Sequence, residues 1–151
     1  MPLEFTDHLE ICNLLYGYCF HFDRNEPDQI ALLFSEDVSI DYGPEYPSIH
    51  GREAAEASIA SGLRERFLAT SHHVSNIVIQ KKSSNTATGN AYVYAWHRYR
   101  DGSPDGELWG QYQLSFSKIS GHWLITDLKL AGVGTREFHR SRMHSIGRRE
   151  S

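Results

Sequence analysis

Apolar residues in the first part of the chain recur at intervals of three and four positions, which is typical of a helix with one buried face. Thr6 is a suitable N-cap, and acidic residues follow it within the first turns. The pattern predicts a helix from Thr6 to Phe22 or Asp23. Its apolar positions are Leu9, Cys12, Leu15, Tyr16, Cys19 and Phe22.

Two more helices and one short strand are expected before residue 70. Pro27 suits the first position of a short helix whose apolar residues extend to Phe34. Residues 38–42 favour a strand, and residues 43–51, with two prolines, favour a loop. Residues 52–68 are rich in Ala and Glu, which predicts a third helix.

The second half of the chain has the character of long strands. The connections between them contain Ser, Asn, Gly and Pro, and Ser120-Gly121 is the signature of a two-residue hairpin. The expected strands cover residues 71–80, 86–100, 107–119 and 122–130.

Helices followed by a meander of strands predict an α+β fold, with the helices packed on one face of an antiparallel sheet. Strands of this length must twist and bend, so we expect the sheet to form a cup. Helices that rest in such a cup leave a pocket between themselves and the sheet. That pocket is the place where a small-molecule substrate would bind.

Composition predicts one globular domain. The chain has 151 residues, of which 40% are hydrophobic and 23% charged, a balance that excludes a disordered chain. We expect a single domain over residues 1–151, with its core at about 6–132 and a C-terminal tail at 133–151. The net charge of −4 argues against binding of nucleic acid, and no apolar run reaches the length of a membrane span.

The N-terminus and the cysteines favour a cytoplasmic protein. Residues 1–4 lack the basic region of a signal peptide, and no long apolar segment follows them. Cys12 and Cys19 lie two turns apart on the predicted helix, too far for a disulfide. Free thiols suit a reducing compartment.

The expected tail is basic. It is either an arm that binds an anion or a partner, or a solvated or subunit-docking segment, which is the more common use of such tails. Its arginines are Arg136, Arg140, Arg142, Arg148 and Arg149.

Histidines on two predicted strands carry the candidate chemistry. His72-His73 begins one strand and His97 ends the next, so antiparallel pairing brings His73 and His97 together. Neighbouring strand residues alternate between faces, so His72 is expected to point away from His73. Asp23, at the end of the first helix, needs a partner on its largely apolar face. We expect Asp23 to contact His73, because an Asp–His pair in a dry pocket acts as an acid and base near neutral pH; an ordinary structural role for each residue stays open.

The order of elements resembles the SnoaL-like group of the nuclear-transport-factor-two-like superfamily, and several short motifs resemble scytalone dehydratases. The resemblance spans roughly residues 8–140. It implies a cone-shaped α+β barrel, with three N-terminal helices packed in a strongly curved mixed or antiparallel sheet. The motifs are Phe22-Asp23, Ile40-Asp41-Tyr42, His73 within residues 71–76, His97 within Trp96-His97-Arg98-Tyr99, and the hairpin Lys118-Ile119-Ser120-Gly121-His122-Trp123.

Site residues follow from the same resemblance. It implies catalytic roles for Asp23, His73, Tyr42 and His97. The chain departs from the family where Phe22 replaces a Tyr that acts with Tyr42, a role that Tyr18 could take one turn earlier. The chain also departs from the family in the residues that recognise substrate, because Gly110 and Tyr112 stand where the family has a Ser and an Asn. Scytalone itself is therefore not the expected substrate. The expected substrate contacts are Tyr18, Phe22, Asn76, Gly110 and Tyr112.

The expected reaction is the dehydration of a small cyclic hydroxy-ketone, related to polyketides or steroids. His73 would abstract the proton next to a carbonyl, Asp23 would orient His73, and Tyr42 would donate a hydrogen bond to the carbonyl oxygen. His97 would orient the substrate. No metal and no organic cofactor is required. Isomerisation and cyclisation would begin with the same proton abstraction, so both stay open.

Three rival functions also stay open. The same fold could be a non-catalytic binding module, a metal site made of His73, His97 and Asp23, or a structural subunit of a larger enzyme. The alternating aromatic residues Tyr92, Tyr94 and Trp96 form one strand face that would seek a partner. We therefore expect a homo-oligomer, a trimer or a dimer.

Overall fold

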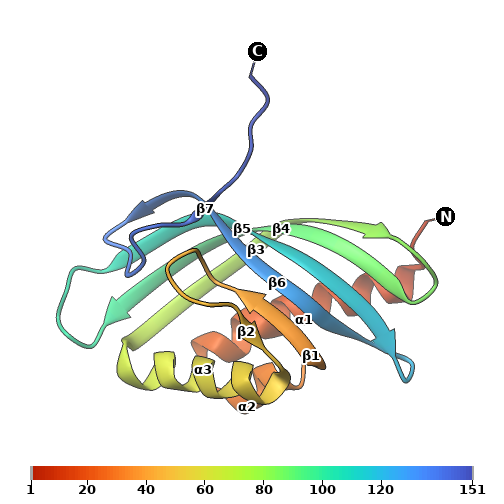
Figure 1. Cartoon of the computed structure of the whole chain (residues 1–151), viewed down its shortest axis with the longest axis horizontal. Coiled ribbons are helices and arrows are strands. Elements are labelled where there is room, and N and C mark those ends of the chain that lie inside the picture. Colours follow the sequence, from red (N-terminus) through yellow and green to blue (C-terminus); the bar gives the residue numbers. More distant parts are fainter. Residues whose placement is uncertain (1, 151) are drawn as a thin grey trace.

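Three helices lie on the concave side of one strongly curved sheet in the computed structural model, which describes residues 2–150 (Figure 1). The chain forms helices first and then a long meander of strands. The elements are α1 (Phe5–Asp23), α2 (Pro27–Ala31), β1 (Phe34–Asp41), β2 (Ile49–His50), α3 (Arg52–Glu65), β3 (Phe67–Lys81), β4 (Thr86–Tyr99), β5 (Gly106–Ile119), β6 (His122–Arg136) and β7 (His144–Ser145).

The sheet is mixed and open. Its strands follow the order β2-β1-β6-β5-β4-β3, and β7 pairs with β6 outside this path. The β1–β6 and β6–β7 pairs are parallel, and the other pairs are antiparallel. The expected α+β fold with three helices in a curved mixed sheet is confirmed. The cone is not a closed barrel, because β2 and β3 at the two ends of the path do not pair.

Two of the helices end earlier than expected. The second helix ends at Ala31, and Phe34 begins β1 instead of ending the helix. The guanidinium of Arg52 holds Phe34 in the sheet by donating from Nε and Nη2 to its carbonyl oxygen, at 2.9 and 2.6 Å. The third helix ends at Glu65, because buried Phe67 already pairs with Tyr99 as the first residue of β3.

The buried face of α1 is rotated relative to the expected one. Tyr16 is half exposed, whereas Tyr18, two residues later, is almost wholly buried. The face that meets the sheet follows helical spacing through Ile11, Leu15, Tyr18 and Cys19. Both cysteines of the helix are buried free thiols, as expected.

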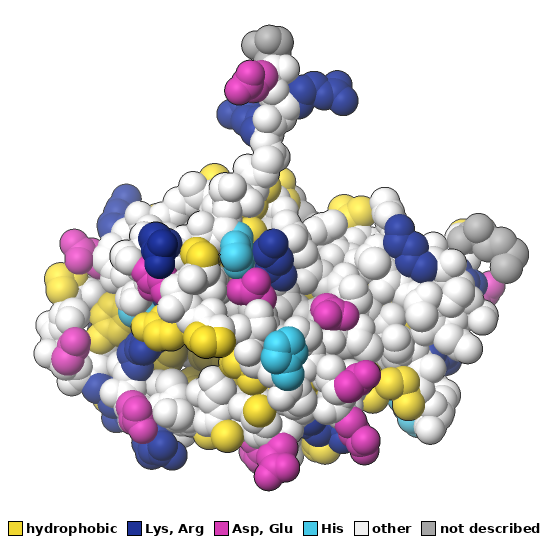
Figure 2. All heavy atoms as spheres, in the orientation of Figure 1, with side chains coloured by type: hydrophobic (Ala, Val, Ile, Leu, Met, Phe, Trp, Pro, Cys, Tyr) yellow, Lys and Arg dark blue, Asp and Glu magenta, His cyan; other side chains and the backbone are white. Residues whose placement is uncertain are grey.

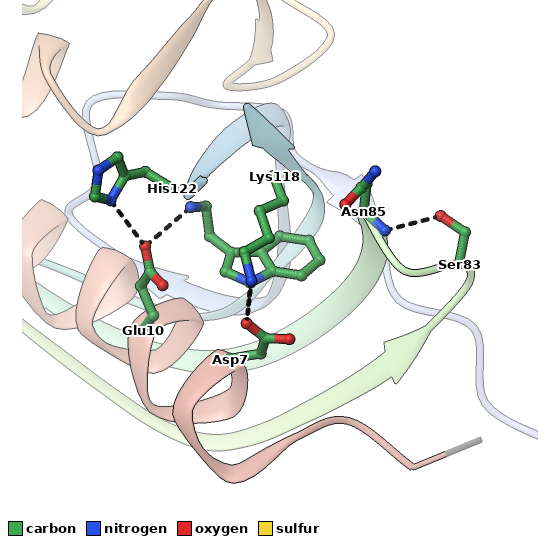
Figure 3. A network of polar contacts seen from close by, with 7 residues as sticks. Asp7, Glu10, Ser83, Asn85, Lys118 and His122 are labelled. Atoms are coloured by element: carbon green, nitrogen blue, oxygen red, sulfur yellow. Dashed lines mark hydrogen bonds and ion pairs between the residues drawn. The ribbon is translucent and has the colours of Figure 1, made fainter. Parts of the chain in front are cut away.

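Acidic residues attach the start of α1 to the β5–β6 hairpin (Figure 3). The carboxylate of Asp7 accepts hydrogen bonds from Nζ of Lys118 and from the indole nitrogen of Trp123, both at 2.9 Å. Glu10 accepts the backbone N–H of Trp123 at 3.0 Å. The Lys118 contact, followed by the Trp123 contact, lowers the pKa of Asp7. This hairpin motif therefore has a structural role.

The C-terminal segment folds back onto the body. Strand β6 continues to Arg136, beyond the expected end of the core, and β7 then pairs with its middle. Glu45 accepts hydrogen bonds from the backbone of Ser141 and Arg142, at 3.1 and 3.0 Å, and from the Ser141 hydroxyl. Nε2 of His144 lies 2.9 Å from Oδ2 of Asp41. Only the last residues project from the body, and Lys or Arg side chains lie along them (Figures 1 and 2).

The convex face of β4 carries the aromatic residues noted above. Tyr92 is half exposed, and Tyr94 and Trp96 are partly buried. The expected homo-oligomer stays a prediction. None of the helices within residues 2–150 is long and apolar enough to cross a membrane.

Candidate active site

One pocket lies between the helices and the concave face of the sheet. Side chains of α1, α3, β3, β4, β5 and β6 form its wall, and the C-terminal segment covers part of it. The lining is mostly aromatic and apolar, with a few polar groups, as in many small-molecule sites. It consists of Tyr18, Phe22, Tyr42, Ser58, Ile59, Gly62, Arg66, Phe67, His72, Ala95, His97, Leu108, Tyr112, Leu130, Phe138, His139 and Arg140.

Asp23 holds His72 in this pocket. Nδ1 of His72 lies 2.7 Å from Oδ1 of Asp23, and the backbone N–H of His72 donates to Oδ2 at 2.8 Å. The hydroxyl of Thr70 donates to Oδ1 at 2.9 Å. The His72 side chain is only 7% exposed, whereas the Asp23 side chain is 25% exposed, so the ring is shielded from water and the carboxylate is partly open to it. Because Nδ1 is bound to the carboxylate, Nε2 is the nitrogen that remains available to a ligand.

The expected contact between Asp23 and His73 is wrong. In the β3–β4 register His73 lies opposite Tyr94 on the convex face, whereas His72 lies opposite Ala95 on the concave face. His73 is exposed, lies beside the Tyr94 ring and bonds with the Ser71 hydroxyl at 3.0 Å. The alternation of faces was predicted correctly, but the wrong histidine was placed inside.

A signal for the correct choice was present in the sequence. Thr70, His72 and Val74 share one face of the strand, and Ser71, His73 and Ser75 share the other. The first set contains the only aliphatic residue of the six, and burial favours that face. Because His73 lies on the convex face, it does not meet Asp23 and His97, so these three residues do not form the metal site that was considered. Within residues 2–150, no group of three His, Cys, Asp or Glu side chains is arranged to hold a metal.

His97 lies beside His72 and not beside His73, so the expected approach of His73 and His97 is wrong. The ring centroids of His72 and His97 are 5.3 Å apart. His97 is buried, and among residues 2–150 its Nδ1 atom has no hydrogen-bond partner. Burial, followed by the influence of His72, lowers the pKa of His97 to about 3. His97 is therefore neutral near pH 7 and offers a hydrogen-bonding nitrogen to a ligand.

Two tyrosines form a second polar contact in the pocket wall. The hydroxyl oxygens of Tyr18 and Tyr42 are 2.6 Å apart. Burial raises the pKa of Tyr42 to about 12 and the pKa of Tyr18 well above its usual value, so both hydroxyls keep their protons. One hydroxyl donates to the other, which leaves one O–H free to donate to a ligand. Tyr18 thus contacts Tyr42, as expected of a substitute for the family's tyrosine that Phe22 replaces.

Aromatic rings complete the wall around these groups. Phe22 packs against His72 with ring centroids 4.7 Å apart. The ring of Tyr112 meets that of Tyr18 edge-on at 5.6 Å. Both residues line the pocket where substrate contacts were expected.

Several lining residues were not expected from the sequence. Phe138, His139 and Arg140 belong to the segment expected as a tail, and Arg66 lies between α3 and β3. Burial, followed by the influence of the neighbouring His97, lowers the pKa of His139 to about 2. No local pattern marks these residues, because the return of the C-terminal segment brings three of them to the pocket.

Comparison with known proteins agrees with this geometry. The SnoaL-like domain family matches residues 4–129. The chain belongs to this family. A structure from Novosphingobium aromaticivorans of a protein proposed to be a scytalone dehydratase is 34% identical, with a TM-score of 0.89 and 96% of both chains covered. No curated protein matches the chain.

Two more distant structures share the fold alone. A hexachlorocyclohexane dehydrochlorinase of type 3 from Novosphingobium barchaimii is 14% identical, with a TM-score of 0.81 and coverage of 95% of this chain and 96% of that one. A protein from Novosphingobium aromaticivorans proposed to be an aromatic ring hydroxylase is 19% identical, with a TM-score of 0.81 and coverage of 88% and 93%. Together with the family match and the 34% identical structure, these likenesses support a SnoaL-like fold of the nuclear-transport-factor-two-like kind.

Two expected substrate contacts of this SnoaL-like chain lie outside the pocket lining. Asn76 is exposed on the bulge of β3 between Ser75 and Val78, with a φ of 51°. Gly110 faces the neighbouring strand, where an added Cβ would lie 2.4 Å from the carbonyl oxygen of Ala131. Its small size allows the strands to approach and is not a gap left for substrate.

Proposed function

We propose that this protein is a cofactor-independent dehydratase of a small cyclic hydroxy-ketone, related to polyketides or steroids. The proposal rests on one observation, a histidine held by a carboxylate in the same pocket as a pair of protonated tyrosine hydroxyls. Such a set provides a base and a donor to a developing oxyanion, which are the two groups that elimination next to a carbonyl requires. The SnoaL-like fold and its small-molecule pocket support an enzyme that converts small molecules.

In the first step, Nε2 of His72 removes a proton from the carbon next to the ketone. The electron pair of that C–H bond moves into the enolate, and the negative charge gathers on the carbonyl oxygen. The free O–H of the Tyr18–Tyr42 pair donates a hydrogen bond to this oxygen. Asp23 stabilises the imidazolium that forms on His72.

In the second step, the enolate expels the hydroxyl from the β carbon. The C–O bond breaks, a C=C bond forms, and the proton on His72 leaves with the hydroxyl as water. His72 returns to its neutral state, so the cycle consumes no oxidant or reductant. His97, neutral and with a free Nδ1 atom, orients the substrate or its departing hydroxyl.

Adjacent histidines provide a matched test of the base. Purified wild type, His72→Ala and His73→Ala proteins are given cyclic β-hydroxy-ketones, from 3-hydroxycyclohexanone to 3-hydroxy-1-tetralone. Absorbance and mass spectrometry monitor the loss of water. Exchange of the α-proton with solvent in D₂O monitors proton abstraction. We expect His72→Ala to lose a factor of about 10²–10⁴ in rate and His73→Ala to stay near wild type.

Three outcomes separate the alternatives. Wild-type turnover by His72→Ala would show that His72 is not the base. Exchange without loss of water would favour isomerisation or cyclisation. Absence of both exchange and dehydration over the whole panel would favour the non-catalytic binding module.

A further inference from the structure

Two arginines of the pocket make no ion pair within residues 2–150. Arg140, from the C-terminal segment, and Arg66, from the connection between α3 and β3, both line the pocket that contains His72. They also line an adjoining cleft at its mouth. Within residues 2–150, neither side chain makes an ion pair or a hydrogen bond to protein, and the Nη1 atom of Arg140 is buried without a partner.

The surroundings of Arg140 compensate only part of its charge. Its guanidinium carbon lies 4.9 Å from the ring centre of Tyr46 and 5.6 Å from that of Tyr42, so two aromatic faces attract the cation. They provide no acceptor in the plane of the guanidinium. Burial, followed by the charge of Arg66, lowers the pKa of Arg140, which is the effect of a cation that lacks an anionic partner.

Glu45, an acidic residue beside the C-terminal segment, already binds that segment. Oε1 of Glu45 accepts hydrogen bonds from the backbone of Ser141 and Arg142 and from the Ser141 hydroxyl. No ion pair joins Glu45 to Arg140 among the described residues, although the carboxylate influences the guanidinium. Glu45 therefore fixes the segment that carries Arg140 and leaves the guanidinium itself free for a ligand.

We propose that the substrate carries a carboxylate, which binds to Arg140 with the support of Arg66, while its ring places the reacting carbon at His72. A guanidinium forms two parallel hydrogen bonds with a carboxylate, a geometry that suits a flat anion between aromatic faces. This inference rests on the proposed function, and it narrows the substrate to an acidic cyclic hydroxy-ketone. It also gives the basic C-terminal segment the anion-binding role that its composition left open.

The test uses two ligands that differ in charge and cannot lose water. Isothermal titration calorimetry at pH 7.5 compares 3-oxocyclohexanecarboxylate with its neutral amide, 3-oxocyclohexanecarboxamide. We expect wild type to bind the carboxylate at least about 10-fold more tightly than the amide, because hydrogen bonds to charged groups contribute more than neutral ones. Arg140→Met should abolish this preference, and Arg66→Met should reduce it. Arg142→Met, an exposed arginine of the same segment outside the pocket, is the matched control and should retain it.

Binding is measured separately from turnover. The same titration on His72→Ala should give the wild-type preference, so a failure of the dehydratase proposal leaves this result unchanged. Equal binding of the two ligands by wild type, or binding of neither up to millimolar concentration, overturns the inference without any variant. A preference that survives in folded Arg140→Met and Arg66→Met proteins overturns it too. Loss of kcat in Arg140→Met with an intact preference would assign Arg140 to the enolate and would also overturn it.

Discussion

The carboxylate of Asp23 binds both the ring and the backbone of His72. Oδ1 meets the ring nitrogen Nδ1 at 2.7 Å, and Oδ2 accepts the backbone N–H at 2.8 Å. The end of α1 is therefore attached to the strand beside the imidazole that it orients. This double contact fixes the position of the ring as well as the site of its proton, since only a protonated Nδ1 can donate to a carboxylate.

Asp23→Asn is expected to reduce turnover of a cyclic β-hydroxy-ketone by about 10²-fold or more, because the imidazolium formed on His72 loses its anionic partner. The amide also has only one acceptor for the donors that now share two oxygens. Steady-state kinetics measure the loss, and circular dichroism checks the fold. Asp28→Asn changes an exposed carboxylate of α2 whose one side-chain hydrogen bond within residues 2–150 comes from Gln29, and it is the control. Equal rates for wild type and Asp23→Asn would contradict the role of the carboxylate.

Tyr42→Phe should lower kcat by a factor of about 10²–10³, the usual cost of one lost oxyanion donor. KM should change much less, because charge on the carbonyl oxygen develops only after binding. Tyr18→Phe is expected to behave similarly, since each hydroxyl orients the other at 2.6 Å. Tyr16→Phe, half exposed on the same helix, provides the control. If both Phe variants retain the wild-type kcat, the tyrosine pair does not stabilise an oxyanion.

Asp7 should contribute stability that depends on pH. Its pKa in the folded protein is below the ordinary value of 3.8, chiefly because of Lys118 and then Trp123. A lowered carboxyl pKa stabilises the fold above the unfolded value, and this contribution is lost as the pH falls through the folded value. Asp7→Asn should therefore be less stable than wild type at pH 7, and the difference should shrink below about pH 3.8. Urea unfolding at several pH values measures it, and a difference independent of pH would argue against the ion pair.

Gly110→Ala is expected to cost about 1–3 kcal/mol of unfolding free energy, because the new Cβ would overlap the carbonyl oxygen of Ala131 at 2.4 Å. Gly134→Ala is the matched control in the paired strand, since its Cβ would meet nothing within 4 Å. Its change should stay within about 0.5 kcal/mol. Chemical denaturation compares the two variants. Equal stability would mean that Gly110 does not set the spacing of β5 and β6.

Local patterns predicted most of the elements and one part of the site. Helical spacing predicted α1, and turn residues marked the ends of the long strands. The fold class and the order of its layers followed from these two patterns. His97, among small residues of β4, was correctly placed in the pocket, and Asp23 at the helix end was correctly expected to bind a histidine of β3. Tyr18 was named as a substitute for the missing tyrosine, and it contacts Tyr42.

The position of Val74 favoured His72, but the register of β3 against β4 fixed the choice between His72 and His73. A shift of one residue exchanges the two faces of a strand, and pairing with Ala95 or Tyr94 decides which histidine is buried. The expected substrate contact of Asn76 was misplaced for a related reason. A bulge at residues 75–78 breaks the alternation of the strand and leaves Asn76 exposed.

The sequence by itself determined the amphipathic helices, the alternating strands and the presence of an Asp and a His near the ends of these elements, because such features depend on neighbours a few positions away. The tertiary structure fixed which histidine Asp23 binds, which the sequence only favoured through Val74, and it alone decided that Arg140 enters the pocket. Those two results depend on strand register and on the return of the C-terminal segment to Glu45, contacts between residues that are remote in the chain.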